Sequence, residues 1–138
     1  MPAARVAVVD AYSSGALLAP AFAKHGHECV AIHSRREVPE LFHSSFTPDD
    51  FVAIVHADIG ALATAAELAR LDVRHVLAGS EPGVELADEL CERMGLAANG
   101  AAQRAARRDK YLMGEAVRSR GLRKSIMPTP PYLRWCPA

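Results

Sequence analysis

Cysteine and aromatic residues are scarce in this sequence, and neither sign of charge is in excess. The three cysteines, Cys29, Cys91 and Cys136, lie far apart without a CxxC pair, which argues against zinc and favours reduced thiols. The 16 Lys and Arg residues balance 16 Asp and Glu residues, so no summed positive charge would attract nucleic acid or an anionic membrane. No stretch approaches the roughly 20 apolar residues of a membrane span. We therefore expect a cytoplasmic protein with neither nucleic acid nor membrane as a partner.

The sequence does contain four short apolar runs that are rich in β-branched residues. They cover residues 6–11, 29–34, 51–56 and 75–80. Each run is nearly continuous in hydrophobicity instead of alternating, which is typical of parallel strands covered by helices on both faces. Because 138 residues are enough for one compact core, we expect a single domain built around these strands.

A helix is predicted between the first and second runs, over residues 13–26. Leu18 and Phe22 fall at helical spacing in this stretch, and Gly26 supplies a left-handed end. Pro20 belongs either to the first turn, where its missing N–H costs little, or to a bend in the helix.

Two further helices are predicted around the fourth run. The stretch 58–73 is expected to face the core through one stripe, formed by Leu62, Ala66, Ala69 and Val73. The stretch 82–96 begins with Pro82 at the first helical position and ends with Gly95 and Leu96 in a Schellman motif. Its inward residues are expected to be Val84, Ala87, Cys91 and Met94.

The rest of the chain is less regular. Residues 101–122 predict a helical stretch in two pieces, with Asp109 as a cap and Gly121 as the end. Residues 35–50 hold one helical turn at most, because prolines bracket it.

These elements predict an α/β fold of the Rossmann-like, doubly wound type. Right-handed crossovers leave few topologies, and we expect a mostly four-stranded parallel sheet in the order 3-2-1-4 with helices on both faces. In such sheets ligands bind outside the carboxyl ends of the strands, where the strand order reverses. Loops 10–15 and 79–83 meet there, so they are predicted to line a shared crevice.

Loop 10–15 carries Ser13, Ser14 and Gly15 directly before a helix. Free N–H groups and the helix dipole at such a position favour an anion, which makes these residues candidates for ligand binding. The alternative is that Ser13 or Ser14 only caps the helix. A GxGxxG pattern is absent, so a dinucleotide site has little support.

Glu81, in loop 79–83, precedes Pro82 and is expected at the mouth of the same crevice. Its carboxylate either stabilises a helix N-terminus, by up to about 1 kcal/mol, or binds the amino group of a substrate. Both interpretations are open from position alone.

Other polar residues near strand ends give weaker indications. Arg35 and Arg36 follow the second strand, where an NADP phosphate can bind, although a solvated basic pair is the simpler interpretation. The six histidines lack the spacing of a metal motif, and no metal site is predicted. Asp10 and Asp58 end strands as the acids of a phospho-receiver domain do, but Val9 replaces the adjacent acid.

Three separated blocks resemble the N-terminal, pre-ATP-grasp region of ATP-grasp carboxylate-amine ligases, especially amino-acid ligases. They are VVDAYSSG with LAPAF and GHECVAIHS, then AGSEPGVELADELCERMGL, then RRDKYLMGEAVRSRGL, and they span about residues 5–123. The resemblance implies a Rossmann-like domain on the substrate side of an enzyme. Such enzymes use ATP and magnesium to activate a carboxylate as an acyl phosphate, which then passes to an amine.

The resemblance also implies roles for single residues. By itself Lys110 is most simply a surface lysine that pairs with Asp109 or Glu115, worth under about 1 kcal/mol. In the family it resembles the lysine that reaches the ATP phosphates. Glu81 resembles the acid that several relatives direct at a substrate amine, whereas Ser13, Ser14 and Gly15 match the loop that lines that pocket.

The family continues after GLRK with a second ATP lysine, a glycine-rich flap and the Glu/Asn pair that binds magnesium. Here residues 124–138 are expected to be an extended, poorly ordered tail with four prolines and the lone Trp135, separate from the domain over residues 1–123. We therefore expect a truncated ligase domain with no catalytic residue of its own and no activity alone. ATP and magnesium belong to the full-length family, and neither is firmly expected for this chain.

Two other classes of function are open. The loops 10–15 and 79–83 suffice for a stand-alone module that binds a nucleotide or small metabolite, and the proline-rich tail suits an interaction protein. For a ligase domain, the expected partners are an amino acid and either a second copy of the chain or the missing ATP-grasp half, bound through an apolar interdomain face.

Overall fold

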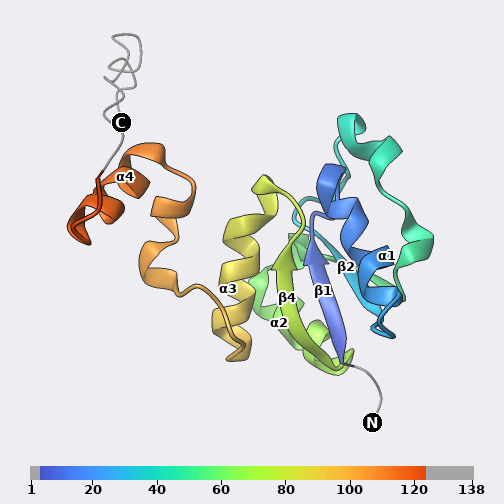
Figure 1. The fold of residues 1–138 in the computed structure, drawn as a ribbon. Coiled ribbons are helices and arrows are strands. Elements are labelled where there is room, and N and C mark those ends of the chain that lie inside the picture. Colours follow the sequence, from blue (N-terminus) through green and yellow to red (C-terminus); the bar gives the residue numbers. More distant parts are fainter. Residues whose placement is uncertain (1–3, 124–138) are drawn as a thin grey trace. The chain divides into compact units, whose positions relative to one another are not determined.

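The computed structural model describes residues 4–123, which fall into two compact units (Figure 1). Among these residues, 4–101 belong to the first unit and 102–123 to the second. The predicted domain over residues 1–123 spans parts of both units and stays a prediction. The predicted tail, residues 124–138, lies outside the described residues.

A four-stranded parallel sheet forms the centre of the first unit. Its strands are β1 (Arg5–Val9), β2 (Cys29–His33), β3 (Ala53–His56) and β4 (Val73–Ala78). They lie in the order β3-β2-β1-β4, which confirms the predicted topology. The bounds of the strands differ from those of the apolar runs by up to two residues. For example, β4 begins at Val73 and ends before Gly79.

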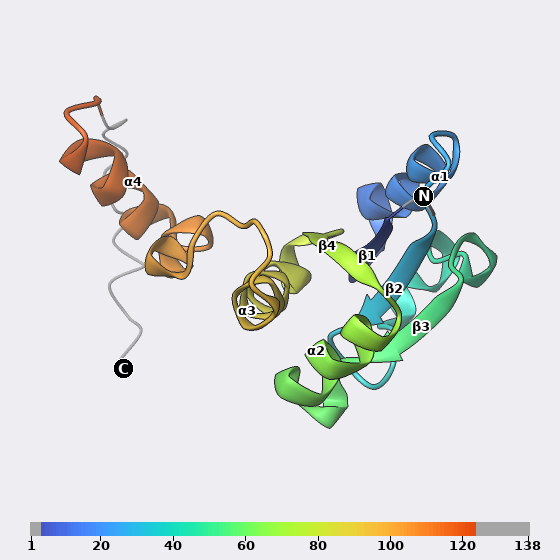
Figure 2. The same ribbon diagram turned by 90° about the horizontal axis from the view of Figure 1, so that it is seen from below.

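Helices cover both faces of this sheet (Figure 2). One face carries α1 (Leu18–Ala23), which follows a 3-10 helix, η1 (Ser13–Leu17), and packs Ala19 against Val6 and Cys29. The other face carries α2 (Ala61–Arg70) and α3 (Val84–Met94).

The larger core cluster lies between the sheet and the pair α2 and α3. Its fully buried side chains include Val9, Ile32, Leu68 and Leu90. Burying one such side chain stabilises the fold by about 1.5 to 3 kcal/mol, so this cluster is the main source of the unit's stability.

The buried face of α2 differs from the predicted one. Leu62 is 72% exposed, and Ala66 and Ala69 are exposed as well, whereas Thr64, Ala65 and Leu68 are buried. The hydrophobic pattern is misleading here because Thr64 is polar in sequence but satisfied in the structure, where its hydroxyl donates to the Gly60 carbonyl at 2.8 Å. Of the predicted stripe only Val73 is buried, and it belongs to β4.

The predicted C-terminal ends of α1 and α3 are confirmed, whereas the predicted start of α3 at Pro82 is wrong. Pro20 lies in the first turn of α1, and Gly26 has the predicted positive φ of 80°. Gly95 ends α3 with φ 63°, and the Leu96 N–H donates to the Cys91 carbonyl at 2.9 Å, as a Schellman motif requires. The helix α3 itself starts at Val84, because Pro82 lies in a separate 3-10 turn, η5 (Glu81–Gly83).

Short 3-10 helices make up the connections in the first unit. They are η2 (Glu40–Ser45), η3 (Pro48–Asp50) and η4 (Ala57–Ile59). Residues 35–50 contain no α-helix, as expected, but two 3-10 helices occur where at most one helical turn was predicted.

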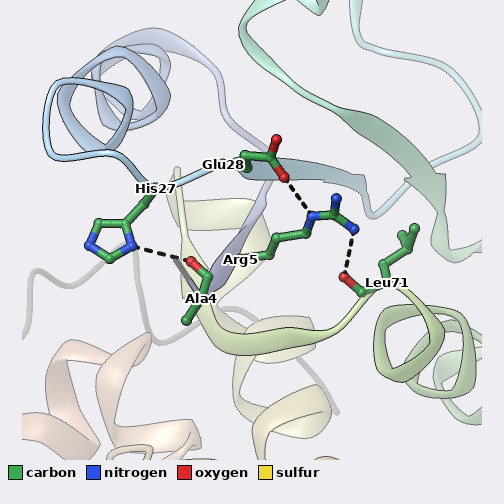
Figure 3. A network of polar contacts seen from close by, with 5 residues as sticks. All are labelled: Ala4, Arg5, His27, Glu28 and Leu71. Carbon is green, nitrogen blue, oxygen red and sulfur yellow. Dashed lines mark hydrogen bonds and ion pairs between the residues drawn. The ribbon is translucent and has the colours of Figure 1, made fainter. Parts of the chain in front are cut away.

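A polar network ties together the amino-terminal edge of the sheet (Figure 3). Arg5 donates to the Glu28 carboxylate at 2.8 Å and to the Leu71 carbonyl at 3.1 Å. His27 lies 3.3 Å from the Ala4 carbonyl through Nδ1. These contacts join β1 to the segment before β2 and to the turn between α2 and β4.

The second unit is helical within the described residues. It contains η7 (Ala105–Arg107) and α4 (Lys110–Ser119), after η6 (Ala101–Gln103) at the boundary between the units. Asp109 is the predicted cap, since its carboxylate accepts from the N–H groups of Tyr111 and Leu112 at 2.8 and 3.1 Å. Between residues 4 and 123, no helix has the length and apolarity that a membrane crossing needs.

Candidate substrate crevice

The loops after β1 and β4 pack directly against each other. The Gly79 N–H donates to the Val9 carbonyl at 2.7 Å, and the Ser80 hydroxyl donates to the Asp10 carbonyl at 2.8 Å. A Cβ on Gly15 would lie 2.1 Å from the Gly79 carbonyl oxygen, which only glycine can permit. The predicted convergence of these two loops is therefore confirmed.

Asp10 fixes the junction between β1 and β2. Its side chain is 2% exposed, and its carboxylate accepts from the Ser34 N–H at 2.9 Å and the Ser34 hydroxyl at 2.6 Å. Its φ of 53° is unusual for a residue with a side chain, and such strained positions cluster at functional sites. The Asp10 carboxylate is thus held by Ser34 beside the hollow that it helps to line.

Aromatic rings form one wall of the site. The ring of Tyr12 stacks on Phe42 with centroids 5.2 Å apart, and the Tyr12 hydroxyl lies 2.8 Å from His33 Nδ1. Burial and the nearby Asp10 carboxylate raise the pKa of Tyr12, whereas burial and the facing His56 lower the pKa of His33. Both groups are therefore neutral near pH 7, and a hydrogen bond joins the tyrosine hydroxyl to Nδ1.

A small hollow of about 200 Å³ opens between these loops. Its lining consists of Asp10, Tyr12, Ser34, Arg35, Pro39, Phe42 and Pro82. A wider and more open groove of about 880 Å³ also has Arg35 and Pro39 in its wall. Arg35 thus borders both spaces.

The predicted residues of loop 10–15 have different surroundings. Ser13 and Ser14 are exposed, and neither lines the small hollow. The Ser13 N–H already has a partner within the chain, since it donates to the Ser45 hydroxyl at 2.9 Å. No side chain caps η1, whose N-cap residue is Tyr12, so the capping interpretation of Ser13 and Ser14 is wrong. Gly15 is buried and serves the close approach of the two loops.

Glu81 lies at the rim of the crevice. It is exposed in the first turn of η5, and the next residue, Pro82, lines the small hollow. The structure brings Glu81 to the same loop pair as Gly15, as predicted. Lys110 is exposed and is the first residue of α4, in the second unit. It is therefore not one of the residues of the crevice in the first unit.

Sequence reasoning missed the residues that line the hollow most directly. Tyr12, Ser34 and Phe42 carried no motif, and Arg35 was interpreted as part of a solvated pair. Position in the sequence could have indicated Arg35, because it directly follows Ser34 at the carboxyl end of β2, beside the reversal of strand order where ligands bind.

No protein-family model matches the chain. Dapdiamide A synthase from Enterobacter agglomerans is 35% identical over 124 residues, which cover 85% of this chain and 28% of that protein. The crystal structure of an L-amino acid ligase from Bacillus licheniformis superposes with a TM-score of 0.66 at 10% identity, over 89% of this chain and 32% of the other.

A phosphoribosylglycinamide synthetase from Anaerococcus prevotii superposes with a TM-score of 0.62 at 18% identity. The superposition covers 86% of this chain and 29% of the synthetase. The chain is similar to the N-terminal part of ATP-grasp ligases. The predicted resemblance is thereby confirmed, and the chain spans only 28% of the length of its ligase relative in sequence. The two superpositions establish the ligase-type α/β fold, since their sequence identities are low.

Related ATP-grasp ligases use ATP and magnesium. Within the part of the chain that the structure describes, no group of three or more His, Cys, Asp or Glu side chains is placed to hold a metal ion. Lys110 is the single predicted nucleotide contact among these residues.

Proposed function

We propose that this chain is the substrate-side, N-terminal domain of an ATP-grasp ligase that joins a carboxylate to an amine through an acyl phosphate. The observation that carries the proposal is the 35% identity to Dapdiamide A synthase over 85% of the chain. The crevice between the loops after β1 and β4 supports it, because ligands of such sheets bind at this position.

Within this proposal Glu81 binds the amino group of the substrate. Its carboxylate lies at the rim of the crevice, on a turn fixed by Pro82 and by the Ser80 hydrogen bond to Asp10. A carboxylate held on a rigid turn discriminates well between a charged amine and an uncharged analogue. Ser13 and Ser14, exposed on the facing loop, supply hydroxyls at the outer edge, and Gly15 keeps that loop close.

Lys110 contributes a positive charge to the nucleotide site. It is exposed at the first position of α4, behind the Asp109 cap, so its ammonium group is available to the ATP phosphates. A fixed positive charge there stabilises the negative charge that moves during phosphoryl transfer. Magnesium is held by other parts of the ligase.

The proposal further assigns this chain an amino acid as small-molecule ligand and the ATP-grasp half of a ligase, or a second copy of the chain, as partner. A groove of about 450 Å³ is the surface for that partner, with apolar side chains such as Leu62, Met94 and Leu96 beside the charged Asp72, Arg74 and Arg93. The setting is cytoplasmic. Sedimentation at high protein concentration tests the homodimer, and a strictly monomeric profile excludes it.

Binding of an amino acid is the direct test of the substrate role. Titration of ¹⁵N-labelled protein with L-phenylalanine should shift the amide resonances of both crevice loops in the wild type. The Glu81→Gln variant should weaken binding about tenfold or more, since it removes one charge-assisted contact. Glu85→Gln is the matched control, because Glu85 is also an exposed acid near a helix start but lies in α3, beyond the turn Glu81–Gly83 that contributes Pro82 to the hollow. Equal affinities of the two variants would contradict the role of Glu81.

We also propose that these 138 residues do not catalyse ligation by themselves. A coupled assay for ADP release with a panel of amino acids should show no turnover, because the described residues include no cluster of three or more His, Cys, Asp or Glu side chains that could hold the metal ion of phosphoryl transfer. Robust turnover by the purified chain would contradict this part of the proposal.

One observation favours a second function. The hollow and both loops belong wholly to the first unit, so a stand-alone module that binds a nucleotide or small metabolite needs nothing further. Calorimetry with ATP, NAD(P) and amino acids separates the two functions. Tight nucleotide binding that is lost in Ser14→Ala, without amino-acid binding, would favour the stand-alone module.

A further inference from the structure

We infer that Arg35 selects the ligand's carboxylate in the small hollow, opposite in charge to Glu81 at the rim. The inference rests on the proposed function, in that the crevice is taken to bind an amino acid. It assigns to the site a cationic contact that the sequence comparison did not supply.

The first observation is that Arg35 keeps its charge available. It forms no hydrogen bond or ion pair with any residue between positions 4 and 123, although it borders both hollows. Four other arginines of the first unit are paired with neighbouring acids, at 2.6 to 3.3 Å: Arg5, Arg70, Arg74 and Arg93. Arg35 and Arg36 are the two arginines of the first unit's described residues without such a pair, and of these two only Arg35 lines the two hollows.

The second observation is that the backbone beneath Arg35 is held in place. Ser34, the preceding residue, donates both its N–H and its hydroxyl to the carboxylate of Asp10. Asp10 is in turn locked to the β4 loop through the Ser80 hydroxyl. A binding residue on a fixed backbone loses less freedom when the ligand arrives, which favours specific binding.

The size and lining of the hollow define the class of ligand. At about 200 Å³ it is smaller than the roughly 300 to 1,000 Å³ of pockets for drug-sized molecules, so a dinucleotide does not fit within it. Pro39, Phe42 and Pro82 give it an apolar wall beside the guanidinium. One small molecule with a carboxylate and an apolar body matches this combination.

The charges of the two loops complete the match. Arg35 follows β2, and Glu81 follows β4 next to Pro82, which shares the hollow with Arg35. A free amino acid carries a carboxylate and an ammonium group on one carbon, so it presents opposite charges to these two residues. Arginine is suited to the carboxylate because its planar fork makes two parallel hydrogen bonds.

The test compares L-phenylalanine with L-phenylalaninamide, which lacks the carboxylate, in NMR titrations of the full chain. Wild-type protein should bind the acid about ten- to a hundredfold more tightly than the amide, as expected for a charge-assisted contact. Arg35→Gln should remove this preference, leave the affinity for the amide unchanged and preserve the spectrum of the folded protein. Arg36→Gln is the matched control, because Arg36 is the adjacent exposed arginine and lines neither hollow.

The outcomes separate this inference from the proposed function. If the wild type binds both compounds equally, or if Arg35→Gln and Arg36→Gln behave alike, the role of Arg35 is refuted while the amino-acid site stands. If the wild type binds neither compound, the proposed substrate role fails, and the inference fails with it.

Discussion

At the scale of single residues, glycines decide whether the crevice can form. Gly15, Gly79 and Gly83 each lie where an added Cβ would come within 2.1 to 2.8 Å of backbone atoms of the neighbouring loop or strand. Such contacts cannot be relieved by rotating a side chain, because the obstructing atoms belong to the backbone. The two loops can therefore pack this closely only if all three positions are glycine.

The first prediction concerns Gly15. Gly15→Ala should lower the free energy of unfolding by about 3 kcal/mol or more, since its Cβ would lie 2.1 Å from the Gly79 carbonyl oxygen. Gly26→Ala, with φ 80° but nothing within 4 Å of the added Cβ, should cost only about 1 to 2 kcal/mol. Urea denaturation measures both, and equal losses would show that the loops do not pack this closely.

The second prediction concerns pH. Burial and the facing His56 lower the pKa of His33, so the unfolded chain binds a proton at this residue at a higher pH than the folded chain does. The free energy of unfolding should therefore have its full value above the usual histidine pKa of about 6.5 and decrease as the pH falls below it. The nearby Asp10 carboxylate opposes part of this effect.

Urea denaturation between pH 7.5 and 5.5 measures the effect of His33. The variant His33→Gln should lose less stability over this interval than the wild type, because its side chain takes up no proton. His25→Gln, at an exposed position, should retain the wild-type loss. A wild-type stability that does not change with pH would show that protonation of His33 is not resisted by the fold.

At the scale of elements, the apolar stripe of α2 faces away from the main core. The residues with helical apolar spacing, Leu62, Ala66 and Ala69, border the groove of about 450 Å³, whereas Thr64 faces the core. Thr64 tolerates burial because its hydroxyl bonds to the Gly60 carbonyl. The face of α2 was thus set by packing against β4 and α3, and not by hydrophobicity alone.

The third prediction distinguishes the two faces of α2. Leu68→Ala should cost about 2 to 5 kcal/mol of stability, since Leu68 is fully buried in the main core. Leu62→Ala should cost under about 1 kcal/mol, because that side chain is 72% exposed. Thermal and urea denaturation measure both variants, and a larger loss for Leu62→Ala would restore the face predicted from the sequence.

At the scale of the whole molecule, the balanced charge conceals a strong asymmetry. Of the 16 acidic residues, 14 lie in residues 1–101, whereas 9 of the 16 basic residues lie in residues 102–138. The first unit is therefore acidic and the second basic. Total charge alone gave no sign of this, because the two excesses cancel.

The fourth prediction concerns the independence of the first unit. Residues 1–101 expressed alone should fold and bind L-phenylalanine with the affinity of the full chain, because both core clusters and the hollow lie within them. Dispersed amide resonances and an NMR titration measure this. A fragment without dispersed resonances would show that the second unit is needed for the fold.

The sequence by itself determined the four parallel strands, their order and the ends of α1 and α3. Continuous apolar runs, Gly26 and the pair Gly95 and Leu96 are local signals, which act over a few residues and survive without tertiary context. Only the tertiary structure decided the inner face of α2, the burial of Thr64 and the union of Asp10, Tyr12, Ser34 and Arg35 around one hollow. These features arise from contacts between segments distant in the chain, where the pairing of one polar group with another determines which side chains can be buried.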